Sequence, residues 1–219
     1  MRSARIRAIA LLAIATSVSF AQDTRDRATD PLGRLDPSTR YVVEMLMDSA
    51  HSVGLPYGPL ESKALEGIAK RANGRDILVA VRRVFRALRD ARTALGPSAT
   101  ADELTAAAGA LRAGIAASEL SRLATTRNGK PLTMPLVVLA DLVTRGVPPD
   151  TAAFTIFQLW QRGAADDDFL GLWRSVERDI VSGTDPGVAL LNRAREIPAN
   201  RPSTVVPPAA GVRPEDAKS

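Results

Sequence analysis

The chain has no cysteine and one histidine, and only 4% of its residues are aromatic. The absence of cysteine excludes disulfide bonds, thiolate catalysis and cysteine-ligated metals. The single histidine, His51, would need carboxylate partners to build a transition-metal site. We expect it instead to supply favourable charge near the end of a helix. The few aromatic residues also disfavour an aromatic-lined cleft for glycan substrates.

Acidic residues form three groups that could suggest a site: Asp166 with Asp167 and Asp168, Glu61 with Glu66, and Glu177 with Asp179. The consecutive aspartates lack the alternating ligands and central glycine of a calcium loop, and they suit a helix N-terminus. Neither carboxylate pair has the spacing that places both members on one helix face. No Gly-x-Ser-x-Gly elbow is present. We therefore predict no catalytic residue, no metal ligand and no cofactor, so an enzyme is disfavoured.

The start of the chain has the three parts of a secretory signal peptide. Three arginines precede an apolar core, 8–15, that is shorter than the roughly 20 residues a bilayer requires. Small residues stand at Ser19 and Ala21, the positions that signal peptidase reads. Without a cysteine at this point, a lipid anchor is excluded. The sequence predicts cleavage after Ala21 and a soluble periplasmic or extracellular protein, with no transmembrane segment remaining after cleavage.

Cleavage would change the charge of the chain. The removed segment takes Arg2, Arg5 and Arg7 with it and no acid, so the net charge falls from +5 to +2. A nearly neutral mature chain without a concentrated basic patch is atypical of nucleic-acid binding. We therefore predict no nucleic-acid partner.

The composition divides the chain into four predicted segments. Residues 1–21 are the predicted signal peptide, and the polar residues 22–35 form a predicted disordered linker. Residues 36–197 are long enough for a single domain with its own apolar core. Residues 198–219 carry five prolines among small and polar residues, which predicts a disordered tail.

Start and stop signals for helices alternate along residues 36–197. Asp36 and Asp185 each precede a proline, as N-cap residues often do, and Thr100 with Glu103 has the spacing of a capping box. No segment shows sustained strand alternation. The sequence predicts an all-α fold, an irregular array or orthogonal bundle of about nine short helices. Their expected ranges are 37–53, 59–72, 75–95, 101–113, 117–126, 134–145, 149–162, 167–182 and 186–196.

Glycine ends one predicted helix after another, where a left-handed residue is often needed. The positions are Gly54, Gly96, Gly114, Gly146, Gly163 and Gly183. Several of these glycines precede an aliphatic residue, as in Gly114-Ile115 and Gly146-Val147, which we expect to close the helix end by apolar contact. The linking glycines stand at positions 54, 114, 146 and 163, so the intervals between them shrink along the chain. This unevenness favours an irregular array over a regular solenoid.

Two predicted helices, 134–145 and 149–162, are apolar around most of their circumference, which indicates burial. We expect them to form the centre of the fold. We also expect five aromatic side chains to lie in the core: Phe154, Phe157, Trp160, Phe169 and Trp173.

The predicted helix 75–95 has an apolar stripe and, opposite it, an arginine face made of Arg75, Arg82, Arg86 and Arg89. Arginine binds carboxylates and phosphates through two parallel hydrogen bonds. A solvated helix face is the simpler interpretation of this pattern, because Asp76 and Asp90 are close by.

Taken together, the residues favour an exported, non-enzymatic helical protein of a bacterial-type cell envelope that binds or scaffolds an envelope protein. One alternative is a module that binds anionic envelope polymers or lipid headgroups through the arginine face of 75–95. A second alternative is an exported hydrolase whose site has no recognisable motif.

Overall fold

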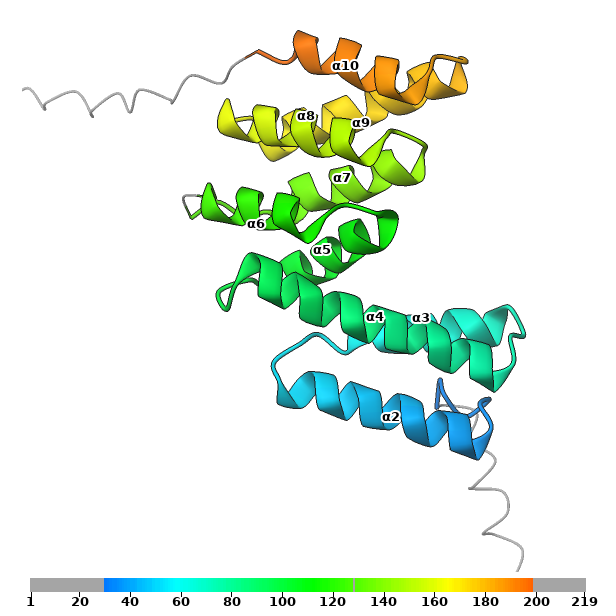
Figure 1. The fold of residues 1–219 in the computed structure, drawn as a ribbon. Helices are drawn as coiled ribbons and strands as arrows, with labels where there is room; N and C mark the ends of the chain where they lie inside the picture. Colours follow the sequence, from blue (N-terminus) through cyan, green and yellow to red (C-terminus); the bar gives the residue numbers. More distant parts are fainter. Residues whose placement is uncertain (1–29, 128, 199–219) are drawn as a thin grey trace, which may run out of the picture. The chain divides into compact units, whose positions relative to one another are not determined.

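The computed structural model describes residues 30–127 and 129–198. These residues form nine helices and no strand, so the all-α prediction is confirmed (Figure 1). The predicted signal peptide, the predicted tail beyond Pro198 and the first part of the predicted linker lie outside the described residues. The chain divides into two compact units, one ending at Phe85 and the other beginning at Arg86. The single domain expected over 36–197 stays a prediction.

The first unit contains α2 (Pro37–Ser52), α3 (Gly58–Ala69) and the part of α4 (Gly74–Leu95) that precedes Arg86. Its first helix begins as the sequence predicts, because Asp36 Oδ1 accepts a hydrogen bond of 3.0 Å from the Thr39 amide. Helix α2 packs on α3. The buried apolar side chains of this unit include Leu32, Val43, Ala50, Leu55, Leu60, Ala64, Ile77 and Val81.

The first unit starts earlier than the composition suggests. Residues 30–35 fall in the segment predicted as a linker, yet Leu32 is only 5% exposed. Backbone hydrogen bonds of 3.0 Å join the Gly33 amide to the Asp30 carbonyl and the Leu35 amide to the Leu32 carbonyl. Asp30 also pairs with Arg40 of α2 at 2.6 Å. Two leucines in a segment of six residues are too few to make a periodic pattern, so only tertiary packing reveals that this segment is folded.

The second unit holds α4 from Arg86 onward, followed by six helices in two layers (Figure 1). One layer is made of α5, α7 and α9, which pack in that order, and the other of α6, α8 and α10. Helices α7 and α8, and likewise α9 and α10, form antiparallel pairs that link the layers. The helices span α5 (Ala101–Ala113), α6 (Ala117–Thr125), α7 (Thr133–Thr144), α8 (Pro149–Gln161), α9 (Asp166–Val181) and α10 (Pro186–Glu196).

The second unit is more regular than the spacing of its glycines suggests. Helices α5, α7 and α9 begin at Ala101, Thr133 and Asp166, at almost equal intervals along the chain. The glycine positions hide this period because Gly114 and Gly146 end the first helix of a pair, whereas Gly163 ends the second. The array is therefore built from three consecutive helix pairs of similar length.

The predicted glycine helix ends are confirmed. All six glycines have positive φ, from 69° at Gly54 to 109° at Gly114. The aliphatic residue after the glycine closes the helix as expected, since the Ile115 amide donates to the Ala110 carbonyl at 3.0 Å. Ile115 itself is 3% exposed. This pairing of a left-handed residue with a following apolar contact is the Schellman arrangement.

Helices α7 and α8 occupy the middle of the second unit, as their apolar composition predicts. Helix α7 packs on α5, α8 and α9, and α8 packs on α6, α7 and α10. Of the five aromatic residues expected in the core, Phe157, Trp160 and Phe169 are buried and Trp173 is partly buried. The prediction for Phe154 is wrong, because its side chain is 56% exposed. Helix α8 keeps one narrow outward face, and Phe154 lies on it.

None of the helices in residues 30–127 and 129–198 combines the length and apolar character that crossing a bilayer requires.

Candidate binding groove

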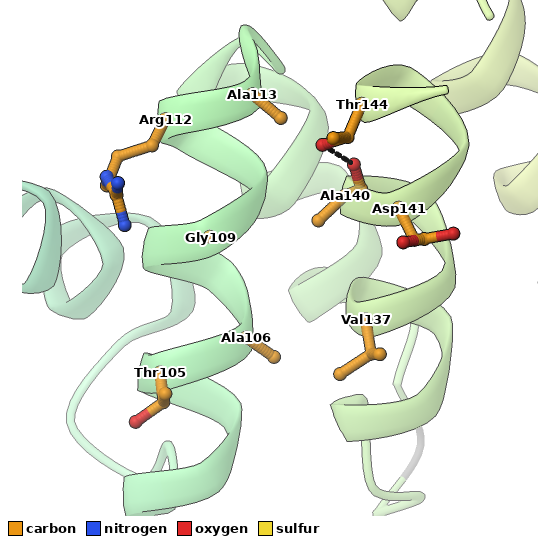
Figure 2. A pocket seen from close by; sticks show the side chains of 9 residues that line it. All are labelled: Thr105, Ala106, Gly109, Arg112, Ala113, Val137, Ala140, Asp141 and Thr144. Carbon is orange, nitrogen blue, oxygen red and sulfur yellow. Dashed lines mark hydrogen bonds between the residues drawn. The ribbon is translucent and has the colours of Figure 1, made fainter. Parts of the chain in front are cut away.

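A shallow groove of about 490 Å³ runs between α5 and α7 in the second unit. Residues from both helices recur every three or four positions along its walls, the spacing of one helix face. Figure 2 shows Ala106 and Ala113 of α5 pointing toward α7, and Ala140 and Val137 of α7 on the facing wall. The complete lining is Thr105, Ala106, Gly109, Arg112, Ala113, Val137, Ala140, Asp141 and Thr144.

Small side chains produce this groove. A Cβ atom built on Gly109 would lie 3.9 Å from the Cβ atom of Ala140, an ordinary van der Waals distance. An alanine would therefore fit at position 109, whereas a longer side chain there would project into the groove. Because alanine and glycine fill little space, the two helices leave an open channel outside their closest contact. Val137 on the α7 wall is 47% exposed.

The two charged residues of the lining differ in their surroundings. Trp173 donates its indole N–H to the Asp141 carboxylate, and Arg145 Nε lies 2.5 Å from the same oxygen, Oδ2. Asp141 is thus already engaged with α9 and with its own helix. Arg112 is exposed, and no carboxylate of the described residues lies within 4.0 Å of it. Its side chain extends from α5 on the side away from α7 (Figure 2), and it lines the groove at the outer edge of the α5 wall.

A buried carboxylate fixes the beginning of α7 against α5. Glu103 in the first turn of α5 has a fully buried side chain. Its Oε1 accepts from the Leu132 amide at 2.9 Å and from Arg127 Nη2 at 2.8 Å, while Oε2 accepts from the Thr100 amide at 3.0 Å. Burial opposes ionisation of Glu103, but the Leu132 and Thr100 amides and the Arg127 guanidinium outweigh it. The pKa of Glu103 is therefore held below its usual value of 4.5.

The capping box of Thr100 and Glu103 is confirmed, and it is all that the sequence pattern reveals about Glu103. The contacts to Arg127 and Leu132 bridge 24 and 29 residues of chain. No local spacing rule reaches that far. The burial of this carboxylate and its role between α5 and α7 therefore have no signal in the sequence.

A second cluster joins α7 to α9. Besides the contacts at Asp141, Arg145 Nη1 lies 2.8 Å from Glu177 Oε1, and the Arg145 guanidinium carbon is 5.4 Å from the centre of the Trp173 ring. These contacts raise the pKa of the Arg145 guanidinium, chiefly through the hydrogen bond to Asp141. The α7 wall of the groove is thus held from both sides, by α5 through Glu103 and by α9 through this cluster.

The four arginines predicted to form a binding face are all exposed on α4. Arg75 and Arg82 belong to the first unit, and Arg86 and Arg89 to the second. None of the four lines the α5–α7 groove. Their function as an anion-binding face stays a prediction.

The carboxylates considered for chemistry occupy ordinary structural positions. Asp168 Oδ2 accepts from the Ala165 amide at 2.8 Å, so the acidic run stands at the start of α9 as expected. Glu66 pairs with Lys63 and with Lys70, and Asp179 pairs with Arg193 at 2.7 Å.

His51 is exposed near the end of α2, with its ring centre 6.2 Å from that of Tyr57. Within the described ranges, no three His, Asp or Glu side chains are grouped so that they could hold a metal ion. Comparison with known proteins returned no matching family, no matching curated protein and no matching solved structure.

Proposed function

We propose that this protein acts by binding another protein, and that the α5–α7 groove receives the partner. The observation that carries the proposal is an open, mainly apolar groove in the second unit whose walls are each anchored by a buried or partly buried polar cluster. A pre-formed groove lets a partner bury apolar side chains without first ordering the receptor, which lowers the free-energy cost of association.

The chemistry of the lining indicates the kind of segment that fits. Small side chains allow close approach of a helix backbone, so an amphipathic helix with alanine-sized or valine-sized residues on one face would fill the groove. Arg112 at the edge, which has no ion pair among the described residues, favours a carboxylate at the rim of that segment. We therefore propose that the groove receives an amphipathic, acidic helix of a protein partner.

We further propose that this binding takes place outside the cytoplasm. Support comes from the residues of 1–21 alone, with their arginines, short apolar core and small residues at 19 and 21. An exported binding or scaffolding protein then suits a chain without recognisable catalytic residues.

A groove-filling substitution tests the proposal. The variant Gly109→Leu places an isobutyl group in the groove, whereas Gly171→Leu makes the same change in α9, where a Cβ would meet nothing within 4 Å. A photo-crosslinking amino acid at position 137 should capture an envelope protein from the native host in saturable amounts. We expect Gly109→Leu to abolish this crosslink and Gly171→Leu to preserve it.

Two results would contradict the proposal. One is a crosslink at position 137 that never saturates. The other is a saturable crosslink that survives Gly109→Leu at the wild-type level. Circular dichroism melting of both variants checks that each remains folded, so loss of capture can be assigned to the groove.

A further inference from the structure

The end of α3 carries a backbone feature found nowhere else in the described residues. Arg71 has φ of 55° and is the one non-glycine residue of that set with positive φ. Its amide donates to the Ile68 carbonyl at 3.0 Å, and the next amide, that of Ala72, donates to the Gly67 carbonyl at 2.9 Å. This is the same helix ending that glycine makes after α2, α5, α7, α8 and α9. An arginine at this position has the backbone strain of the left-handed conformation, which glycine avoids because it has no Cβ.

Arg71 borders a cavity of about 270 Å³ in the first unit. The cavity lies where residues before α2 meet the α3–α4 link, and a second arginine, Arg34, also lines it. The whole lining is Arg34, Leu35, Asp36, Ile68, Arg71, Ala72, Gly74 and Ile77. Two arginines from segments separated by the whole of α2 and α3 thus border one small polar space.

Neither arginine is neutralised by a carboxylate of the described residues within 4.0 Å. The acid in the lining, Asp36, also caps α2, because its Oδ1 accepts from Ser38 Oγ at 2.5 Å and from the Thr39 amide at 3.0 Å. These hydrogen bonds, that from the Ser38 side chain first, lower the pKa of Asp36 to about 2. A Cβ built on Gly74, another lining residue, would lie 2.7 Å from Asp36 Oδ2. Within the described part of the chain, the cavity lining therefore has two cations without an acidic partner and one ionised carboxylate, that of Asp36, which also caps α2.

We infer that this cavity is a binding site for a small oxyanion, a phosphate or a compact carboxylate, held between Arg34 and Arg71. Guanidinium groups offer paired N–H donors that match two oxygens of such an anion. The space is too small for a large ligand and exceeds that of one water molecule many times over. This site is separate from the α5–α7 groove, and the inference does not depend on the proposed function.

The site can be tested with inorganic phosphate and citrate as probes, each titrated at constant ionic strength. Amide shifts of Ala72 and Gly74 in ¹⁵N-edited NMR spectra report on the cavity, and calorimetry gives the affinity. We expect saturable shifts at these two amides with at least one probe. The probe that binds more tightly shows whether phosphate or carboxylate chemistry is preferred.

Three substitutions in the lining should change the affinity for the anion, two by weakening binding and one by tightening it. Arg71→Asn keeps a residue that tolerates the left-handed conformation but removes the charge, and Arg34→Gln removes the other cation. Each should weaken binding by about threefold or more. Asp36→Asn retains an N-cap acceptor and removes the negative charge from the lining, so it should tighten binding by about threefold.

Arg83→Gln is the matched control, because Arg83 is exposed on α4 in the same unit and does not line the cavity. It should leave the affinity unchanged. The inference is overturned if neither probe gives saturable shifts at Ala72 and Gly74, or if Arg71→Asn and Arg34→Gln bind as well as Arg83→Gln. Arg71→Gly, which relieves the backbone strain, should fold at least as well as wild type and still bind the anion about threefold more weakly or worse. Wild-type affinity in that variant would also overturn it.

Discussion

The Glu103 carboxylate accepts a hydrogen bond from the Leu132 backbone amide at 2.9 Å, across 29 residues of chain. This single contact sets the first turn of α5 beside the start of α7. It helps to hold the two walls of the groove together through a carboxylate whose side chain is fully buried. The stability of this region should therefore depend on the ionisation of one side chain.

Replacing Glu103 with Gln should destabilise the protein by about 2 kcal/mol at pH 7, because an amide cannot accept from all three donors. The folded-state pKa of Glu103 is lowered, so its contribution is complete above the unfolded pKa near 4.5. That contribution is lost as the pH falls through the lower folded-state value. Urea denaturation from pH 7 to pH 3 should therefore show the gap between wild type and Glu103→Gln closing below about pH 4.5.

Asp102→Asn is the control for this pH dependence. Asp102 is exposed in the same first turn of α5, and its removal should cost under about 1 kcal/mol. A gap for Glu103→Gln that stays constant down to pH 3 would show that folding does not lower the pKa of Glu103.

Two glycines in helix interiors should respond oppositely to alanine. A Cβ on Gly67 of α3 would lie 2.6 Å from Ile77 Cγ1, so Gly67→Ala should cost about 1–3 kcal/mol through overpacking. Gly171 of α9 has nothing within 4 Å of such a Cβ, so Gly171→Ala should gain up to about 1 kcal/mol from helix propensity. Chemical denaturation of both variants measures the change in the free energy of unfolding. A stabilised Gly67→Ala variant would contradict the close packing of Gly67 against Ile77.

The left-handed residue after α3 should be improved by glycine. Arg71→Gly is expected to raise the free energy of unfolding by about 1 kcal/mol, because glycine has no Cβ to clash at φ of 55°. The reciprocal change, Gly54→Ala, should lower it by about the same amount. Position 54 has a φ of 69° and no atoms near a new Cβ, so backbone strain alone acts there. Thermal melting without added anions is the measurement, and a loss of stability in Arg71→Gly would mean that the arginine side chain itself stabilises the fold.

Export should remove the chain up to and including Ala21. Expressed with its own N-terminus in a host with a general secretion system, the protein should begin at Gln22, as N-terminal sequencing or intact-mass analysis would show. Replacing Ala21 with Leu should block processing, because signal peptidase requires a small residue before the cut. An intact Met1 terminus on the wild-type protein recovered from the cell envelope would contradict cleavage.

Local signals in this chain predict local structure well. Asp36, Thr100 and Asp185 cap the helices that they were expected to cap, and the glycine helix ends have the left-handed backbone predicted for them. Such features depend on a few neighbouring residues, whose backbone preferences act over one helical turn. The exposed Phe154 shows the limit, because an apolar residue in an apolar helix has no local mark of the direction it faces.

The groove and the cavity could not be predicted in this way. The α5–α7 groove depends on Gly109 and Ala140 meeting across helices that a further helix, α6, separates in the sequence. The cavity depends on Arg34 lying near Arg71. Alanine and glycine are ordinary residues in any one helix, and each arginine has the sequence context of a solvated surface residue. Only the packing of the elements brings these residues together.

From residue types and neighbouring residues alone, it follows that the chain is helical, where its helices begin and end, and that cysteine chemistry is absent. Backbone preferences that act within a few positions are enough to fix these properties. Tertiary packing was needed to establish which helix faces stay open, that the Glu103 carboxylate is buried with three donors, and that Arg34 and Arg71 share one cavity. These depend on contacts between residues far apart in the chain, whose free energies are realised only when the helices pack.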